Sequence, residues 1–330
     1  MTLPVSIVIP CFKRVSQTKK TLELLLASDG LNDDFSLELI VADSSPDNSL
    51  CEMLQSFSYP IKYVRPEKVG IAANKNQGAK LSKNELLIFC DSDMEVEPTT
   101  LVTAINCLKE RSKTAMLTGQ VVWKKEGVNG QLDRPRKEDR MEKVSQEEYL
   151  EAIYSRFLIT YKSIFWQVGG YDEELFNMRG EGSDLSIRYW RSGFPLGYNP
   201  KIKVHHVHDA EIAVTRNIDF PERGIIRDLI QLGYKYGLKR AESINFAKTL
   251  VWLKDQFGDK DKYIIIENIV SLLPYFWENQ EKIEKSGKNI PSVYDFKFLD
   301  VFTKKELFLD CLNQAEERLK PARDKAFKIL

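Results

Sequence analysis

The sequence predicts an α/β protein built on a mostly parallel, Rossmann-like sheet flanked by helices. Short apolar runs rich in β-branched residues alternate with amphipathic segments through residue 110, which is typical of a parallel sheet. Acidic, polar clusters follow two of these runs, where the carboxyl ends of parallel strands bind ligands. Beyond residue 220 amphipathic helical patterns follow one another, so a helical region is expected after the sheet.

The composition narrows the class of protein. The chain has 330 residues, of which 43% are hydrophobic and 29% charged. This balance excludes intrinsically disordered, collagen-like and coiled-coil proteins. Lys and Arg together number 48 and so do Asp and Glu, which makes the formal net charge zero. We therefore expect no nucleic-acid partner, because no overall positive field is available to neutralise phosphates.

The individual elements of the first part follow from apolar runs and helical spacing. Strands are predicted at residues 5–9, 37–42, 61–64 and 85–90, and helices at 16–28, 74–81, 98–109 and around Leu50, Met53 and Leu54. Pro10 is expected to end the first strand because it lacks a backbone N–H. The polar cluster at residues 43–48 is expected to form a turn.

The pattern changes after residue 123. Residues 124–148 are dense in charge and lack a period, which predicts a solvated loop, with a substrate lid as the alternative. Ordered structure is expected again at residues 154–161 and 163–168, in a helix at 183–191 and in a strand at 201–206, and helical patterns lie at 246–252, 263–273 and 302–319. We predict a catalytic α/β domain over residues 1–220 and a helical region over 221–330.

The motif Asp91-Ser92-Asp93 directly follows an apolar run. Carboxylates at positions i and i+2 of an extended chain project to the same side. Such a pair suits a divalent cation that also binds a phosphate; a turn with solvated caps is the alternative. Asp43 is a second carboxylate after a neighbouring strand, for which an Asx-type turn is the alternative. Two acidic strand ends in one sheet favour a nucleotide-diphosphate crevice more than either does alone.

Two further segments bear on ligand binding. Residues 69–79 are rich in small residues that allow a close backbone approach, but they match neither a dinucleotide nor a Walker pattern. The three histidines, His205, His206 and His208, cluster at the end of a predicted strand and suggest a metal ligand. Alternation favours His206, then His208. A role unrelated to metal stays open, and no cysteine lies nearby for structural zinc.

Four segments, in the same order, resemble glycosyltransferase family 2, whose members are inverting nucleotide-sugar transferases of GT-A fold. They read SIVIPCFKR (6–14), VADSSPDNS (41–49), VGIAANKNQGAKLSKNELLIFCDSDMEVEP (69–98) and GGYDEELFNMRGEGSDLSIRYWRSG (169–193). The resemblance covers residues 5 to 210. It implies metal-dependent sugar transfer from a nucleotide sugar, with UDP expected, to a glycan or lipid-linked acceptor in surface polysaccharide or glycoconjugate synthesis.

The resemblance also implies roles for individual residues. Pro10 and Arg14 would lie near the nucleotide, Asp43 would bind its base, Lys75 and Asn76 would face the nucleotide and donor, and Asp91 would lie near the ribose and sugar. Asp93 would bind Mn²⁺ or Mg²⁺ directly, helped by Asp91 and by His206 or His208. The loop with Gly169, Gly170 and Tyr171 would lie on the acceptor side.

The general base is the least defined role. Family members often have Glu-Asp where this chain has Glu181-Gly182, so the usual base is absent. Glu181 and Asp184 are the candidates, although Asp184 could instead favour the helix dipole or pair with Arg188. If neither serves, a catalytically weak sugar-nucleotide-binding protein results. A nucleotidyltransferase is a further alternative, although residues 10–14 lack its usual glycine-rich, basic loop.

The cellular location of the protein is predicted from its cysteines and apolar runs. Five scattered cysteines without a CxxC pair are typical of buried thiols in a reducing compartment. We expect no signal peptide and a cytoplasmic location. Basic and aromatic residues of the helical region, among them Lys235 and Tyr236, suggest packing on the catalytic domain or a homo-oligomer, with peripheral contact at the inner membrane face as the alternative.

Overall fold

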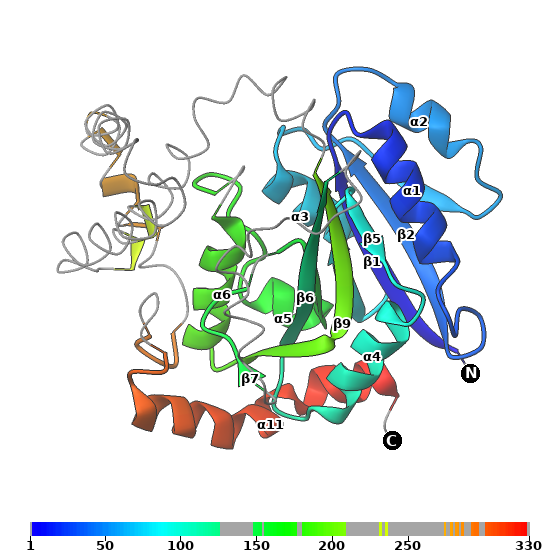
Figure 1. Cartoon of the computed structure of the whole chain (residues 1–330). Coiled ribbons are helices and arrows are strands. Elements are labelled where there is room, and N and C mark those ends of the chain that lie inside the picture. Colours follow the sequence, from blue (N-terminus) through cyan, green and yellow to red (C-terminus); the bar gives the residue numbers. More distant parts are fainter. Residues whose placement is uncertain are drawn as a thin grey trace.

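The computed structural model describes residues 2–125, 148–153, 155–176, 180–208, 231–232, 235–236, 274, 278–279, 281–283, 285–286, 292–296 and 301–328. These residues form a mixed α/β fold around one central sheet (Figure 1). The order of the strands is β3 (Ile61–Val64), β2 (Phe35–Asp43), β1 (Leu3–Cys11), β4 (Leu86–Cys90), β8 (Phe157–Tyr161), β6 (Met116–Lys125), β9 (Leu196–His208) and β5 (Met94–Val96), and β7 (Glu148–Tyr149) pairs with β9. The predicted α/β class is confirmed.

The first half of the sheet is parallel. Strands β3, β2, β1 and β4 pair in parallel, and every residue of β4 is buried. Strands buried on both faces read as continuous apolar runs, which is why β1, β2 and β4 were predicted from the sequence. Their carboxyl ends lie at the same edge, so the residues that follow β1, β2 and β4 are brought together there.

Pro10 does not end the first strand, which corrects the prediction. β1 continues to Cys11, and Pro10 lies opposite Ala42 of β2. On its other side β1 pairs with β4 only from Val5 to Val8. A strand tolerates a proline where it is hydrogen-bonded to a neighbouring strand on one side only. The missing N–H then removes no hydrogen bond on the unpaired side.

The second half of the sheet was only partly predicted. β8 is antiparallel to β4 and β6, β6 and β9 are parallel, and β5 is antiparallel to β9. β5, β6 and β7 were not predicted, and β6 and β7 extend into the two ends of the expected loop at residues 124–148. β9 is longer than the predicted 201–206, because its pairing begins at Leu196 and resumes after an irregularity opposite Gly119 and Gln120.

Helices pack on this sheet close to their predicted positions. They are α1 (Val15–Leu26), α2 (Ser49–Leu54), α3 (Ile71–Leu81), α4 (Thr100–Glu110), α5 (Lys162–Gln167), α6 (Glu181–Arg191) and α11 (Lys305–Phe327). α3 packs on β1 and β2, α4 on β6, β8 and β9, and α5 and α11 on β8. In Figure 1, α1 and α6 lie on opposite sides of the sheet.

The C-terminal helix α11 belongs to the same hydrophobic core as the sheet. Its buried face includes Cys311, Leu319 and Ala322, and Arg323 donates to the carbonyl of Lys109 at the end of α4. The predicted boundary near residue 220, the helical patterns at 246–252 and 263–273 and most of the loop at 124–148 lie outside the described residues. No helix in the described part of the chain is both long and apolar enough to cross a membrane.

Candidate functional site

The ends of β1 and β2 and the start of α3 are joined by polar contacts. The Ser44 amide donates to the Cys11 carbonyl at 3.1 Å, and Asn74 Nδ2 donates to the same carbonyl at 3.0 Å. The Ser44 hydroxyl donates to Asn74 Oδ1. These contacts place Arg14, just beyond the end of β1, at the same edge as the polar turn after β2.

Asp43 lies at the end of β2 and is fully buried. Its Oδ1 accepts from the Ser45 amide at 2.8 Å, which is the Asx-type turn expected as the alternative. Its Oδ2 accepts from the Tyr63 hydroxyl at 2.9 Å, and that hydroxyl accepts from Arg65 Nε at 2.8 Å. The carboxylate is therefore held in one orientation from both sides.

Lys75 is the cation at the centre of the site. Its side chain is fully buried, and its Nζ lies 3.1 Å from Asp91 Oδ1 and 3.7 Å from Glu181 Oε1. The ammonium also donates to the Ser155 carbonyl at 2.7 Å and to its hydroxyl at 3.0 Å. A buried ammonium needs such charged and polar partners, so α3, the end of β4 and the start of α6 meet around one side chain.

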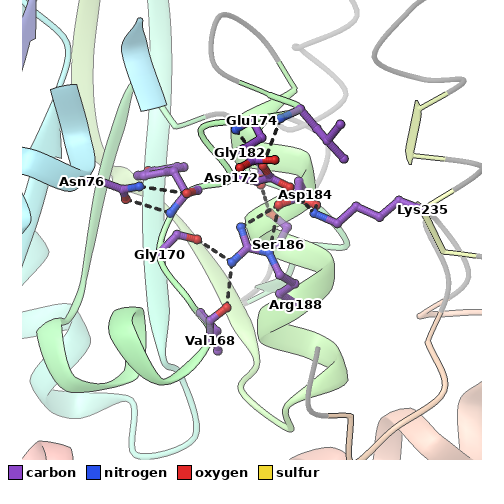
Figure 2. Close-up of polar contacts among 12 residues, drawn as sticks. Asn76, Val168, Gly170, Asp172, Glu174, Gly182, Asp184, Ser186, Arg188 and Lys235 are labelled. Carbon is purple, nitrogen blue, oxygen red and sulfur yellow. Dashed lines mark hydrogen bonds and ion pairs between the residues drawn. The ribbon is translucent and has the colours of Figure 1, made fainter. Parts of the chain in front are cut away.

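Asn76 is the next residue along the same helix, and its amide holds a loop. Asn76 Nδ2 donates to the Tyr171 carbonyl at 2.8 Å, and Asn76 Oδ1 accepts from the Tyr171 amide at 2.9 Å; Figure 2 labels Asn76 and draws both contacts. Asn76 Nδ2 also donates to Glu173 Oε1 at 2.7 Å. A side chain on Gly170 would start 2.9 Å from Asn76 Oδ1, and the φ of Gly170 is +65°. The role of Asn76 toward the nucleotide, expected from the family resemblance, stays a prediction.

Asp93 and His206 form the candidate metal-binding pair. The antiparallel pairing of β5 with β9 places Met94 opposite His206, and His206 Nε2 lies 3.0 Å from Asp93 Oδ2. Arg14 makes an ion pair with the same carboxylate oxygen. A carboxylate oxygen and an imidazole nitrogen are both groups that can ligate a divalent cation.

The other predicted metal ligands are not in this pair. Asp91 contacts Lys75, and the side chain of His208 lies outside the described residues. His205 Nε2 lies 3.0 Å from Glu97 Oε1. Within the part of the chain that the structure describes, no three His, Cys, Asp or Glu side chains lie close enough together to hold a metal ion.

Glu181 is the acidic residue that the start of α6 presents to Lys75. Its side chain is 11% exposed, and its Oε1 accepts from the Ser155 hydroxyl. Next to it, a side chain on Gly182 would start 2.6 Å from the Ile153 carbonyl oxygen and 3.0 Å from the Ser155 amide. An aspartate at position 182 would therefore require the backbone of Ile153 and Ser155 to shift, and Glu181 is the acidic residue that contacts Lys75 from this turn.

Asp184 lies in a different environment, one turn later. It is fully buried; its Oδ2 accepts from Arg188 Nε at 2.9 Å and Nη2 at 2.6 Å, and its Oδ1 lies 2.6 Å from Lys235 Nζ and 2.7 Å from the Tyr236 hydroxyl. Burial would raise the pKa of Asp184, but Arg188, Lys235 and the hydrogen bonds hold this pKa below its ordinary value. The Arg188 pairing considered from the sequence is present.

Several residues of the site were not found from the sequence. Ser155 follows the charge-dense segment and carries no motif, and Tyr63 lies on a short strand whose alternation only marks it as half buried. Asn74 stood within the segment of small residues but was given no role. Lys235 was noted as one of the basic residues of the helical region, and its burial against Asp184 was not predicted.

Comparisons with known proteins bear on the family and the fold of the chain. The family model described as "Glycosyl transferase family 2" matches residues 6–169, which confirms the resemblance seen in the sequence motifs. A validoxylamine A glucosyltransferase of Streptomyces hygroscopicus subsp. jinggangensis (strain 5008) is 23% identical over 226 residues, which cover 58% of this chain and 52% of that protein. The chain thus spans about half the length of this relative.

Two solved structures share the fold. GalNAc-T7, solved with UDP, GalNAc and Mn²⁺, superposes with a TM-score of 0.51 at 18% identity over 64% of this chain and 44% of that chain. The mannosyltransferase PcManGT from Pyrobaculum calidifontis, in complex with GDP-Man and Mn²⁺, has a TM-score of 0.51 at 14% identity over 87% and 86% of the two chains. Identities this low establish the fold and no more.

Proposed function

Because residues 6–169 match the family model of glycosyl transferase family 2, we propose that this protein transfers a sugar from a nucleoside-diphosphate sugar to a hydroxyl group, with inversion at the anomeric carbon. The observation that carries the proposal is the cluster at the carboxyl edge of the sheet. There Lys75 meets Asp91 and Glu181, at the same edge as the pair of Asp93 with His206. A donor site, a cation site and a base are the parts that this reaction requires.

The donor side is formed by the ends of the parallel strands. The family resemblance assigns Asp43 to a ring N–H of the nucleobase; the carboxylate is buried and accepts from Ser45 and Tyr63, so base binding would have to expose one of its oxygens. UDP is the nucleotide that the family resemblance implies. Arg14 adds a positive charge beside Asp93, which a diphosphate needs.

Asp93 and His206 are the residues that would hold a divalent cation. When bound there, the ion would neutralise charge on the departing diphosphate as the glycosidic bond breaks. The chain's own contribution is the pair of oriented ligands: the Asp93 carboxylate and the imidazole that the β5–β9 pairing brings beside it.

The geometry favours Glu181 over Asp184 as the base that takes the proton of the acceptor hydroxyl. Both contacts of the Glu181 carboxylate with described residues fall on Oε1, which leaves Oε2 for the acceptor. Asp184 is fully buried, and both of its oxygens are engaged by Arg188, Lys235 and Tyr236. A carboxylate with a lowered pKa and no exposed surface is a poor proton acceptor for a substrate.

A screen of nucleotide sugars tests the proposal. Thermal shift is measured with UDP- and GDP-linked sugars, with and without Mn²⁺, and donors that stabilise the protein are then assayed for release of the nucleoside diphosphate. We expect a cation-dependent shift and release that rises with an added acceptor. Stabilisation without release would indicate a sugar-nucleotide-binding protein. Pyrophosphate release from a nucleoside triphosphate and a sugar phosphate would indicate a nucleotidyltransferase, and either result would overturn the proposal.

A further inference from the structure

Lys235 bridges two acidic residues in the interior of the protein. Its Nζ lies 2.8 Å from Asp172 Oδ2 and 2.6 Å from Asp184 Oδ1, and its side chain is 2% exposed (Figure 2). Asp172 belongs to the loop of residues 168–176, hereafter the glycine loop, whereas Asp184 lies in the first turns of α6. Lys235 belongs to neither, since it comes from the predicted helical region beyond residue 220.

Arg188 completes the network from α6. It pairs with Asp184, and its Nη1 donates to the Val168 carbonyl at 2.7 Å and to the Gly170 carbonyl. Two buried cations therefore face two carboxylates, and Tyr236 donates a further hydrogen bond to Asp184. A buried ionic network adds little net stability over an apolar core, but it strongly disfavours any arrangement that leaves one member unpaired. The network therefore defines the relative positions of the residues that it joins.

The two residues that Lys235 joins are neighbours in sequence of two residues of the proposed active site. Asp172 follows Tyr171, whose ring centre lies 5.5 Å from Lys75 Nζ. Asp184 lies three residues after Glu181 in α6, and Glu181 also contacts Lys75. The pKa of Tyr171 is raised by its burial and by the nearby Glu181 and Asp91 carboxylates, which is consistent with Tyr171 lying against this acidic cluster.

We propose that Lys235 is a positioning residue that fixes the glycine loop against the start of α6 and so sets where Tyr171 and Glu181 stand around Lys75. The segment that carries Lys235 lies outside residues 6–169, so a part of the chain beyond the matched family segment completes the site. The importance of this position for catalysis rests on the proposed function. The attachment of the glycine loop to α6 through Lys235 does not depend on the proposed function.

The variant Lys235→Met tests the inference in the full-length protein, and Lys282→Met is its matched control. Lys282 also comes from beyond residue 220 and pairs with Glu174 of the glycine loop at 3.5 Å, but it is 58% exposed. For Lys235→Met we expect amide exchange of residues 170–176 to rise at least about tenfold. We expect kcat to fall about 10- to 100-fold, with the donor KM within about threefold of wild type. Lys282→Met should match wild type in all three.

The double variant Asp172→Asn/Lys235→Met separates positioning from stability. It removes one charge of each sign, and asparagine keeps the Oδ1 atom that accepts from the Glu174 and Leu175 amides. We expect its melting temperature to return toward wild type while the fast exchange and low kcat persist. Recovery of kcat together with stability would overturn the inference, and so would equal effects of Lys235→Met and Lys282→Met. If Lys235→Met does not fold, the double variant carries the same comparison.

Failure of the proposed function gives a different result. A wild-type protein that transfers no sugar from any donor would end the proposal of the previous subsection, but the exchange of residues 170–176 would still differ between Lys235→Met and Lys282→Met. Unchanged exchange in an active Lys235→Met enzyme would reject the positioning role alone.

Discussion

The ammonium of Lys75 stands between two carboxylates, 3.1 Å from Asp91 Oδ1 and 3.7 Å from Glu181 Oε1. Asp91 follows β4 and Glu181 begins α6, so one buried cation joins the donor side of the site to the side that we assign to the acceptor. Without the Lys75 ammonium, the carboxylates of Asp91 and Glu181 would repel each other in a site with little water to screen them. The charge of Lys75 therefore makes this active-site arrangement possible.

Replacing Glu181 by glutamine should remove the general base. We expect kcat to fall about 10²- to 10⁴-fold, because a neutral amide cannot take the acceptor proton. Donor binding, measured by calorimetry, should stay close to wild type. The control is Glu174→Gln, which changes an exposed glutamate on the glycine loop. A Glu181→Gln enzyme with the kcat of wild type would show that the base is another residue.

Replacing Asp93 by asparagine should abolish the cation dependence of nucleotide binding. The change removes the carboxylate charge that faces His206 and keeps the size of the side chain. Calorimetric titration of UDP with Mn²⁺ and with a chelator measures the difference between the two conditions. Asp33→Asn, in an exposed turn, should keep the wild-type difference. Cation-dependent binding by Asp93→Asn would refute the metal role.

Replacing Gly182 by alanine should destabilise the protein, although alanine is the better helix former. Propensity alone predicts a gain of about 1 kcal/mol. The added carbon would instead lie 2.6 Å from the Ile153 carbonyl oxygen, which predicts a loss of about 1–3 kcal/mol in the free energy of unfolding. Urea unfolding gives the sign. Ser183→Ala, one residue along the same turn, should change stability by less than about 0.5 kcal/mol.

The stability of the protein should depend on Asp184 in acid. Because the folded-state pKa of Asp184 is lowered, its contribution is fully present above the ordinary value of 3.8 and is lost as the pH falls through the folded-state value. Asp184→Asn should be less stable than wild type at pH 7, and the difference should shrink below pH 4. Urea unfolding at several pH values measures this. Asp33→Asn, in an exposed turn, should show no comparable convergence. A difference that stays constant for Asp184→Asn would contradict the assignment.

The parallel half of the sheet and the acidic residues at its edge were predictable from local patterns. Apolar β-branched runs locate β1, β2 and β4, and the rule that parallel strands end at one edge brings Asp43 and Asp91 together. Pro10 was wrongly predicted to end β1. A proline interrupts a strand only where its missing N–H is needed for a hydrogen bond to a neighbouring strand, and at Pro10 the strand β1 pairs with β2 alone. β5 was missed because it has three residues inside an acidic run, which leaves no length for a period to appear.

The order of residues along the chain was enough to show the resemblance to glycosyltransferase family 2, to predict the parallel half of the sheet and to propose the groups that would carry the chemistry. The sequence alone did not show which residue each charged side chain would contact. Lys75 meets Ser155 from 80 positions away, and Lys235 meets Asp172 from 63. Periodicity and spacing describe neighbours within a few turns, whereas an ion pair forms between whatever groups the closed chain brings within about 4 Å. The separate environments of Glu181 and Asp184, three residues apart, therefore emerged only from the folded protein.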